Sequence, residues 1–263
     1  MSDRECVFCG SKDLSKEHIY SKWIFKIFET KEKSFKPSIH NLLRSNENGI
    51  TDRMSSNVSD GREINYNNFT IKLVCKICNN GWMSELENKI KIIVSKVLSS
   101  EIEINQVTAE EGFLLSQWSI LKSMLTALSV PQKRFFTKME YYLLKNGIIP
   151  EGFVVELAKM KHSNLNFIIG GPLLRKSFEI SREELDRATL NFFKASFQID
   201  IIAFRITYLR TDVPIFRKQI INRLLVIHPY KSLLPFEPQL DSDLDYGSKL
   251  ELAILDAQLT VID

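Results

Sequence analysis

The period with which hydrophobic and polar residues alternate changes along the first part of the chain. Residues 69–74 switch between apolar and polar side chains at nearly every step, which predicts a strand that ends at Cys75. Apolar residues then recur at helical spacing, so we predict an amphipathic helix over residues 80–98. Residues 17–25 are typical of a short strand or turn that leads into a helix. The stretch at about 29–68 is polar and rich in asparagine, and we predict that it is a long, partly mobile insertion.

A second pattern begins near residue 105 and predicts a core of its own. Thr108–Glu111 and Ser181–Glu184 both have the Ser/Thr-x-x-Glu form of a helix capping box. The predicted elements are helices over residues 108–128, 132–146 and 181–193 and strands over residues 152–158, 165–170, 196–209 and 222–228. The sequence therefore predicts an α+β chain in which residues 1–104 form one module and residues 105–263 form an α+β domain.

Composition places the chain among ordinary folded proteins. Its 263 residues are 44% hydrophobic and 25% charged, which excludes wholesale disorder. The net charge of +3 gives no strong argument for a polyanionic partner. The longest apolar runs are interrupted by charged residues, and the residues before Cys6 are polar. We therefore expect a cytoplasmic protein without a secretory signal or a membrane partner.

All four cysteines occur as two Cys-x-x-Cys pairs, Cys6 with Cys9 and Cys75 with Cys78. Four thiolates are a usual ligand set for structural Zn²⁺, and this spacing brings the two sulfur atoms of a pair within reach of one ion. The long separation between the pairs costs little, because the entropy of loop closure grows only logarithmically with length. The alternatives are two unrelated thiol pairs or a redox pair, although neither pair sits in a βαβ pattern.

Each cysteine pair has polar residues beside it that a purely structural zinc site does not need. Glu17 and His18 follow the first pair, and Asn79 and Asn80 follow the second. A zinc ion that joins the two pairs should draw these side chains toward one another. A carboxylate, an imidazole and an amide oxygen can hold a hard divalent cation and activate a water molecule.

The order of these residues resembles the HNH endonucleases of the ββα-metal type, in a bacterial branch with a zinc-stabilised core. The branch has the hallmarks Glu-His-x-x-Pro and Cys-x-x-Cys-Asn-x-x-Trp-Met. At the corresponding places the chain carries Glu17-His18-Ile19-Tyr20-Ser21 and Cys75-Lys76-Ile77-Cys78-Asn79-Asn80-Gly81-Trp82-Met83. The resemblance covers residues 6–24 and 70–88, and it implies an HNH-like module with a zinc-bound ββα fold.

The resemblance also implies a role for each residue. His18 would be the general base that takes a proton from the attacking water, a task that suits a neutral imidazole. Glu17 would ligate a catalytic Mg²⁺ or another divalent cation, with Asn79 as a second ligand, or Asn80 if the helix begins one residue later. The implied activity is metal-dependent hydrolysis of phosphodiester bonds, foremost in DNA, to 5′-phosphate and 3′-hydroxyl ends. Stand-alone nucleases of this family further imply a role in bacterial phage defence.

Two departures from the family pattern bear on the site. Ser21 stands where the branch has proline, which would loosen the turn after His18 without changing a ligand. The asparagine that the family carries before the second cysteine pair falls on Thr70, with Asn68 two positions away. Because that asparagine normally orients the histidine base, the sequence leaves open how His18 is held.

Several of these residues also have an ordinary structural interpretation. His18 could be a surface histidine beside zinc. Glu17 could be an acidic residue that precedes a helix and interacts favourably with the helix dipole, and either asparagine could be a helix N-cap. Glu87 is expected to be a solvated or salt-bridged side chain. The predicted core residues of the helix are Trp82, Met83 and Leu86.

Two other functions stay open at this point. A catalytically inactive zinc module could bind nucleic acid or a protein partner, and an RNA-directed nuclease would use the same chemistry. Residues 105–263 would supply specificity, control or dimerisation, through a homodimer or a protein partner, and no chemistry is assigned to His40, His162 or His228. The lysines expected near phosphate groups are Lys12, Lys16, Lys22, Lys26, Lys72 and Lys76.

Overall fold

The computed structural model of the chain comprises two compact units. Unit 1 is formed by Met1–Phe35 and Ile64–Pro150, and unit 2 by Lys36–Glu63 and Glu151–Asp263. The boundary lies after Pro150 rather than at residue 104, so the two helices that follow residue 104 belong to unit 1. The structure describes residues 4–27, 34–35, 38–46, 49–57, 64–129, 135–170, 173–174, 192–209, 225–228 and 261–262.

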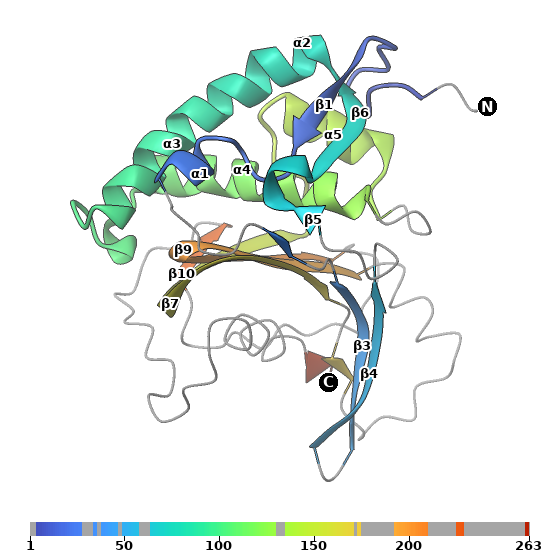
Figure 1. The fold of residues 1–263 in the computed structure, drawn as a ribbon, viewed down its shortest axis with the longest axis vertical. Coiled ribbons are helices and arrows are strands. Elements are labelled where there is room, and N and C mark those ends of the chain that lie inside the picture. The colour runs from blue at the N-terminus through green and yellow to red at the C-terminus, as the bar shows by residue number, and fades with distance from the viewer. Residues whose placement is uncertain are drawn as a thin grey trace. The chain divides into compact units, whose positions relative to one another are not determined.

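Unit 1 combines short antiparallel strands with helices, and it confirms the predicted mixture of α and β structure. Its main elements are β1 (Leu14–His18), α1 (Ile24–Ile27), β2 (Ser34–Phe35), β5 (Ile64–Asn65), β6 (Thr70–Cys75), α2 (Lys76–Cys78), α3 (Ser84–Leu98), α4 (Ala109–Ala127) and α5 (Lys138–Lys145). β1 pairs antiparallel with β6, from Leu14 opposite Cys75 to His18 opposite Thr70. α3 packs against α4 (Figure 1). The strand and the helix predicted on either side of the second cysteine pair are therefore confirmed.

A kink separates the second cysteine pair from the long helix α3. α2 follows β6 directly, and a π-helical turn then covers Asn79–Met83. Within this turn Gly81 has φ of −91° and ψ of −117°, which is not a helical conformation. α3 therefore begins at Ser84, a few residues later than the sequence pattern predicted.

The apolar face of α3 supplies much of the core of unit 1. Leu86, Ile90, Ile93 and Val94 are buried at helical spacing. The predicted core residue Met83 is also buried, and Trp82 is partly exposed. The ring of Phe8, beside the first cysteine pair, meets Trp82 edge to face with centroids 5.2 Å apart. This contact packs the first cysteine pair against the chain that follows the second.

α4 is the predicted helix that starts from a capping box. The N–H of Glu111 donates to Oγ1 of Thr108 at 3.2 Å, and the N–H of Thr108 donates to Oε2 of Glu111 at 3.0 Å. α5 begins from a second capping box, Thr137 with Glu140, which places its start later than predicted. Within the described parts of the chain, no helix combines the length and hydropathy that crossing a membrane requires.

All the described elements of unit 2 are strands, and they form a mixed sheet. They are β3 (Ser38–Asn46), β4 (Gly49–Asn57), β7 (Phe153–Gly170), β8 (Leu173–Leu174), β9 (Phe192–Leu209), β10 (Leu225–His228) and β11 (Val261–Ile262). The strand order is β10-β7-β3-β8-β11, with β4 paired to β3 and β9 paired to β7. Glu156 and Arg205 face each other across β7 and β9 and form a buried ion pair of 2.7 Å.

The polar stretch at 29–68 differs most from its prediction. Its middle part is a hairpin of β3 and β4, and it contributes to the sheet of unit 2. Ile39 pairs in parallel with Ile169, far along the chain, and a local hydrophobic pattern holds no information about such a partner. The two strands predicted over 152–170 form one strand, β7, and most of the helix predicted over 181–193 lies outside the described residues.

Candidate functional site

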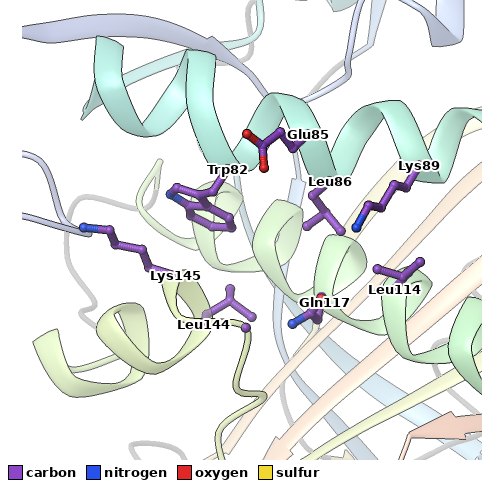
Figure 2. A pocket seen from close by; sticks show the side chains of 9 residues that line it. Trp82, Glu85, Leu86, Lys89, Leu114, Gln117, Leu144 and Lys145 are labelled. Atoms are coloured by element: carbon purple, nitrogen blue, oxygen red, sulfur yellow. The ribbon is translucent and has the colours of Figure 1, made fainter.

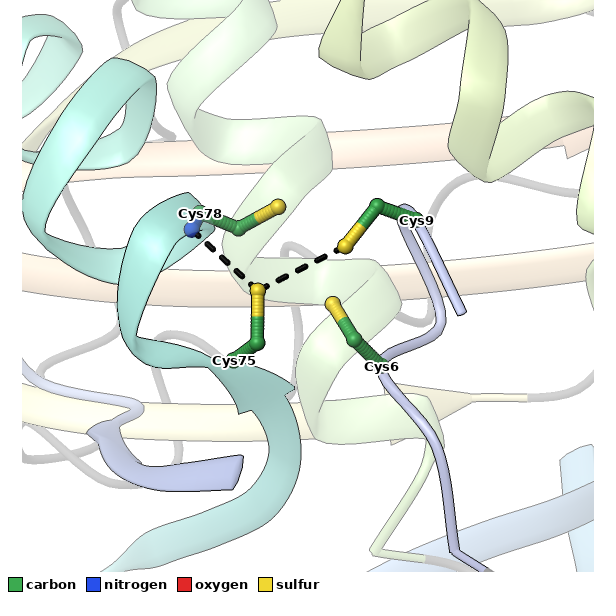
Figure 3. Close-up of side chains that lie close together, drawn as sticks. All are labelled: Cys6, Cys9, Cys75 and Cys78. Carbon is green, nitrogen blue, oxygen red and sulfur yellow. Dashed lines mark hydrogen bonds between the residues drawn. The ribbon is translucent and has the colours of Figure 1, made fainter. Parts of the chain in front are cut away.

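The four cysteines converge at one end of the β1–β6 pair. A tight turn carries Cys6 and Cys9, and it closes where the N–H of Gly10 (φ +76°) donates to the Cys6 carbonyl at 2.8 Å. The four sulfur atoms lie within 4.8 Å of one another (Figure 3). Tetrahedral zinc with Zn–S bonds of about 2.3 Å needs sulfur atoms about 3.8 Å apart. We call these four residues the cysteine cluster, and it could hold a metal ion such as zinc.

The surroundings shift the pKa values of these thiols in different directions. Burial disfavours the thiolate of Cys75, but hydrogen bonds from the Cys78 N–H and the neighbouring thiols outweigh burial and lower the pKa of Cys75 to about 7. Burial raises the pKa of Cys6 and of Cys78. A cation bound among the sulfur atoms would lower the pKa of Cys6 and of Cys78 again, because metal binding displaces the thiol protons.

Glu17 and His18 stand at the end of β1 and differ in their surroundings. Consecutive side chains of a strand point to opposite faces, and Glu17 is buried while His18 is half-buried. His18 lies directly opposite Thr70, the position at which the family resemblance expects asparagine. Burial and then the charge of Lys22 lower the pKa of His18, while the charge of Glu17 opposes them. The imidazole is therefore mostly neutral at pH 7.

A lysine of α4 lies between two carboxylates. Nζ of Lys122 is 2.8 Å from Oε1 of Glu17 and 2.6 Å from Oε1 of Glu87. The side chain of Lys122 is 3% exposed, that of Glu17 9% and that of Glu87 21%. The hydroxyl of Ser21 donates to Glu87. We call Glu17, Lys122 and Glu87 the lysine cluster, which joins β1, α3 and α4.

Lys122 keeps its charge in this buried place. Burial alone would lower the pKa of Lys122, but the carboxylates of Glu17 and Glu87 outweigh burial and raise it. The sequence patterns did not point to Lys122. One signal was present: it is the single basic residue between Ala109 and Leu128, in a largely apolar helix. A lone charge on a helix that is buried requires a partner, because an unpaired charge is costly to remove from water.

The two asparagines after Cys78 serve different purposes. Nδ2 of Asn79 donates to Oγ of Ser15 at 3.1 Å and to the carbonyl of Lys16 at 3.3 Å. These bonds tie the π-helical turn to β1. Asn80 is exposed. Neither asparagine is the N-cap of a helix, because Cys75 caps α2, Cys78 precedes the π-helical turn and Met83 precedes α3.

All six lysines that the sequence placed near the motif have exposed side chains. One of them, Lys76, forms a surface ion pair of 3.1 Å with Asp13. Exposed ammonium groups are the kind that contact a phosphate backbone. The exposed lysines are Lys12, Lys16, Lys22, Lys26, Lys72 and Lys76.

A cleft of about 160 Å³ opens among α3, α4 and α5 of unit 1 (Figure 2). Trp82, Leu86 and Leu144 form apolar parts of its wall. Its charged members are Glu85, Lys89 and Lys145. The cleft shares no residue with the cysteine cluster or the lysine cluster, so it is separate from the chemistry that the sequence predicted.

The structure brings some of the predicted site residues together and separates others. It assembles the four cysteines and sets His18 opposite Thr70. It pairs Glu17 with Lys122, and among the described residues no hydrogen bond joins Glu17 to Asn79. Comparisons with known protein families, with curated proteins and with solved structures found no match to this chain. The geometry of unit 1 therefore carries the functional proposal.

Proposed function

We propose that unit 1 is an HNH-type endonuclease module that hydrolyses phosphodiester bonds, foremost in DNA. The observation that carries this proposal is the order in which the elements meet at the cysteine cluster. β1 and β6 form an antiparallel pair, the second cysteine pair follows β6, and α3 comes next. His18 ends β1 opposite the position of the family asparagine. This order of strand, strand and helix is the one that the resemblance implies.

The metal of the cysteine cluster is, in this proposal, a structural Zn²⁺. Four sulfur atoms within 4.8 Å of one another suit the soft, tetrahedral preference of zinc. Zinc would fix the turn that carries Cys9 to the end of β6, and so hold the strand that ends in His18. Its contribution is to the shape of the module rather than to the reaction.

His18 is the proposed general base. Its lowered pKa leaves the imidazole neutral and ready to accept a proton from an attacking water. The water oxygen would attack phosphorus as His18 takes the water proton, and the bond from phosphorus to the 3′ oxygen would break. The 3′ oxygen would take a proton from solvent, which leaves 5′-phosphate and 3′-hydroxyl ends. A positioned general base contributes about 10²–10⁴-fold to such a rate. The exposed lysines would bind the neighbouring phosphates.

The catalytic divalent cation of the resemblance fits these residues poorly. The carboxylate of Glu17 is buried and bound by Lys122, with Oε1 of Glu17 2.8 Å from Nζ. A Mg²⁺ ion needs carboxylate oxygens at about 2.0–2.1 Å and near-octahedral geometry. Since the carboxylate of Glu17 already binds the ammonium of Lys122, no step of the proposed reaction is assigned to such an ion.

A plasmid assay with the full zinc-loaded chain tests the proposal. Supercoiled DNA is incubated with wild type and with His18→Ala, in Mg²⁺, in Mn²⁺ and without added divalent cation. Cleavage by wild type and loss with His18→Ala supports the module. His162→Ala in unit 2 is the matched control and should cleave like wild type. Equal cleavage by wild type and His18→Ala contradicts the proposal, and a matched RNA substrate decides between the two nucleic acids.

A second candidate is a catalytically inactive zinc module that binds nucleic acid or a protein partner. The observation that favours it is the pairing of Glu17 with Lys122, together with threonine in place of the family asparagine. It predicts that zinc and nucleic-acid binding are retained without cleavage at high protein concentration. A role in phage defence belongs to the first candidate, and loss of protection in cells carrying His18→Ala would be its test.

A further inference from the structure

The ammonium of Lys122 has a complete set of hydrogen-bond partners. It carries three N–H donors. One reaches Oε1 of Glu17 at 2.8 Å and another Oε1 of Glu87 at 2.6 Å. The third reaches the backbone carbonyl of His18 at 3.0 Å. Every donor of a side chain that is 3% exposed is therefore satisfied within unit 1.

This arrangement already places one cation between the two carboxylates. Nζ of Lys122 stands beside Oε1 of Glu17, the residue whose carboxylate the family resemblance assigned to a divalent ion. A second cation at bonding distance from that oxygen would meet the ammonium at close range in a buried site, where repulsion is poorly screened. Lys122 would have to leave, and it is held by three elements of the unit.

The third hydrogen bond ties Lys122 to the backbone of His18, the proposed general base. It fixes the carbonyl of His18, the last residue of β1. Thr70, opposite His18, has no side-chain amide with which to orient the histidine, as the family asparagine does. A donor to the His18 backbone therefore comes from α4, outside the residues covered by the resemblance.

We propose that Lys122 is the resident cation of the lysine cluster and the positioning residue of His18. Glu17 and Glu87 are then anchors for Lys122, and Glu17 is not a metal ligand. The first part of this proposal is independent of the reaction. The second part rests on the proposed function, because it requires a reaction in which His18 takes part.

A titration with Mn²⁺ tests the resident cation. Free Mn²⁺ is followed by electron paramagnetic resonance in solutions of the full zinc-loaded chain, as wild type and as Glu17→Gln. We expect the two proteins to bind Mn²⁺ alike, because the Glu17 carboxylate is committed to Lys122. One equivalent of Mn²⁺ that binds wild type and is lost in Glu17→Gln overturns the proposal.

Steady-state cleavage tests the positioning role. Lys122→Met alone leaves two unpaired carboxylates and can fail to fold, so the triple variant Glu17→Gln/Glu87→Gln/Lys122→Met is compared with the double variant Glu17→Gln/Glu87→Gln. Both are normalised to bound zinc, so that a purely structural role would leave their kcat equal. We expect kcat of the triple variant to fall below that of the double variant by on the order of 100-fold, with KM similar, because a small misplacement of a catalytic group costs about this much.

The outcomes separate the two proposals. Equal kcat in the double and triple variants overturns the positioning role and leaves the nuclease proposal standing. Absence of cleavage by wild type overturns the nuclease proposal and the positioning role with it. The Mn²⁺ titration still decides whether Lys122 is the resident cation in that case.

Discussion

The cysteine cluster joins two turns of the chain around a place for an ion, and the lysine cluster joins β1, α3 and α4 around an ion of its own. The four thiols can become ligands only when they lose their protons to a bound cation. The two carboxylates of the lysine cluster already face the ammonium of Lys122. Two ionisable clusters in one unit can therefore differ in whether they need a metal ion. The first could hold a metal ion such as zinc, and the second already contains a cation of its own.

Loss of a cysteine should have the largest effect. Cys75→Ser removes a buried thiol of the cysteine cluster, and we expect unit 1 to lose its fold, since structural zinc binding is worth about 10–16 kcal/mol in small zinc modules. Circular dichroism and zinc analysis of the purified variant check this. Ile77→Ser lies between the same two cysteines on a side chain that is 78% exposed, and it should keep both zinc and fold. A folded, zinc-free Cys75→Ser protein would contradict the expectation that the fold of unit 1 depends on zinc at the cysteine cluster.

Loss of Lys122 should come second. Lys122→Met leaves Glu17 and Glu87 without their cation, and breaking a buried ion pair costs about 3–5 kcal/mol. Urea unfolding of the zinc-loaded chain measures this change in the free energy of unfolding. The control is Lys138→Met, whose side chain is 90% exposed beside Glu5 and should change stability by less than about 1 kcal/mol. Equal effects of the two variants would mean that the lysine cluster is no stronger than a surface pair.

The hydroxyl that completes the lysine cluster should matter less. Ser21→Ala removes the hydrogen bond to Glu87, and we expect a loss of about 1–2 kcal/mol in the free energy of unfolding. Ser99→Ala removes an exposed hydroxyl that donates to Glu101 at 2.9 Å, and its effect should be within about 0.5 kcal/mol. The same urea series measures both. A larger loss for Ser99→Ala would contradict a stabilising role for the hydrogen bond from Ser21 to Glu87.

The smallest effect concerns the proton of His18. Its pKa lies below the ordinary value of 6.5, mainly because of burial, so the unfolded chain takes up this proton first as the pH falls. The stability associated with neutral His18 is thus present above pH 6.5 and is lost as the pH falls toward the folded pKa. Imidazole NMR, with His18→Ala to assign the resonance, measures that pKa. Glu17→Gln should lower the pKa further, because the Glu17 charge opposes the shift, and a rise would contradict this account of the site.

The sequence predicted the parts of unit 1 that local spacing encodes. Two cysteines three positions apart share a turn, alternation at 69–74 gives β6, and the box at Thr108 starts α4. It did not predict Lys122, because the partner of a buried lysine depends on how α4 packs, with 105 positions separating Lys122 from Glu17. The same reason explains β3, whose pairing with β7 joins distant segments. Tertiary contacts determine the partners of Lys122 and the pairing of β3. The period of hydrophobic residues along the sequence carries no information about such contacts.

The zinc content of the folded, purified chain is the decisive measurement for unit 1. The claim is that one ion, held by the cysteine cluster, shapes unit 1 while the lysine cluster uses Lys122 instead of a second ion. Elemental analysis of protein whose fold is verified by circular dichroism should find one zinc per chain. A well-folded preparation that contains no zinc, even after it is supplied during expression, would contradict the claim.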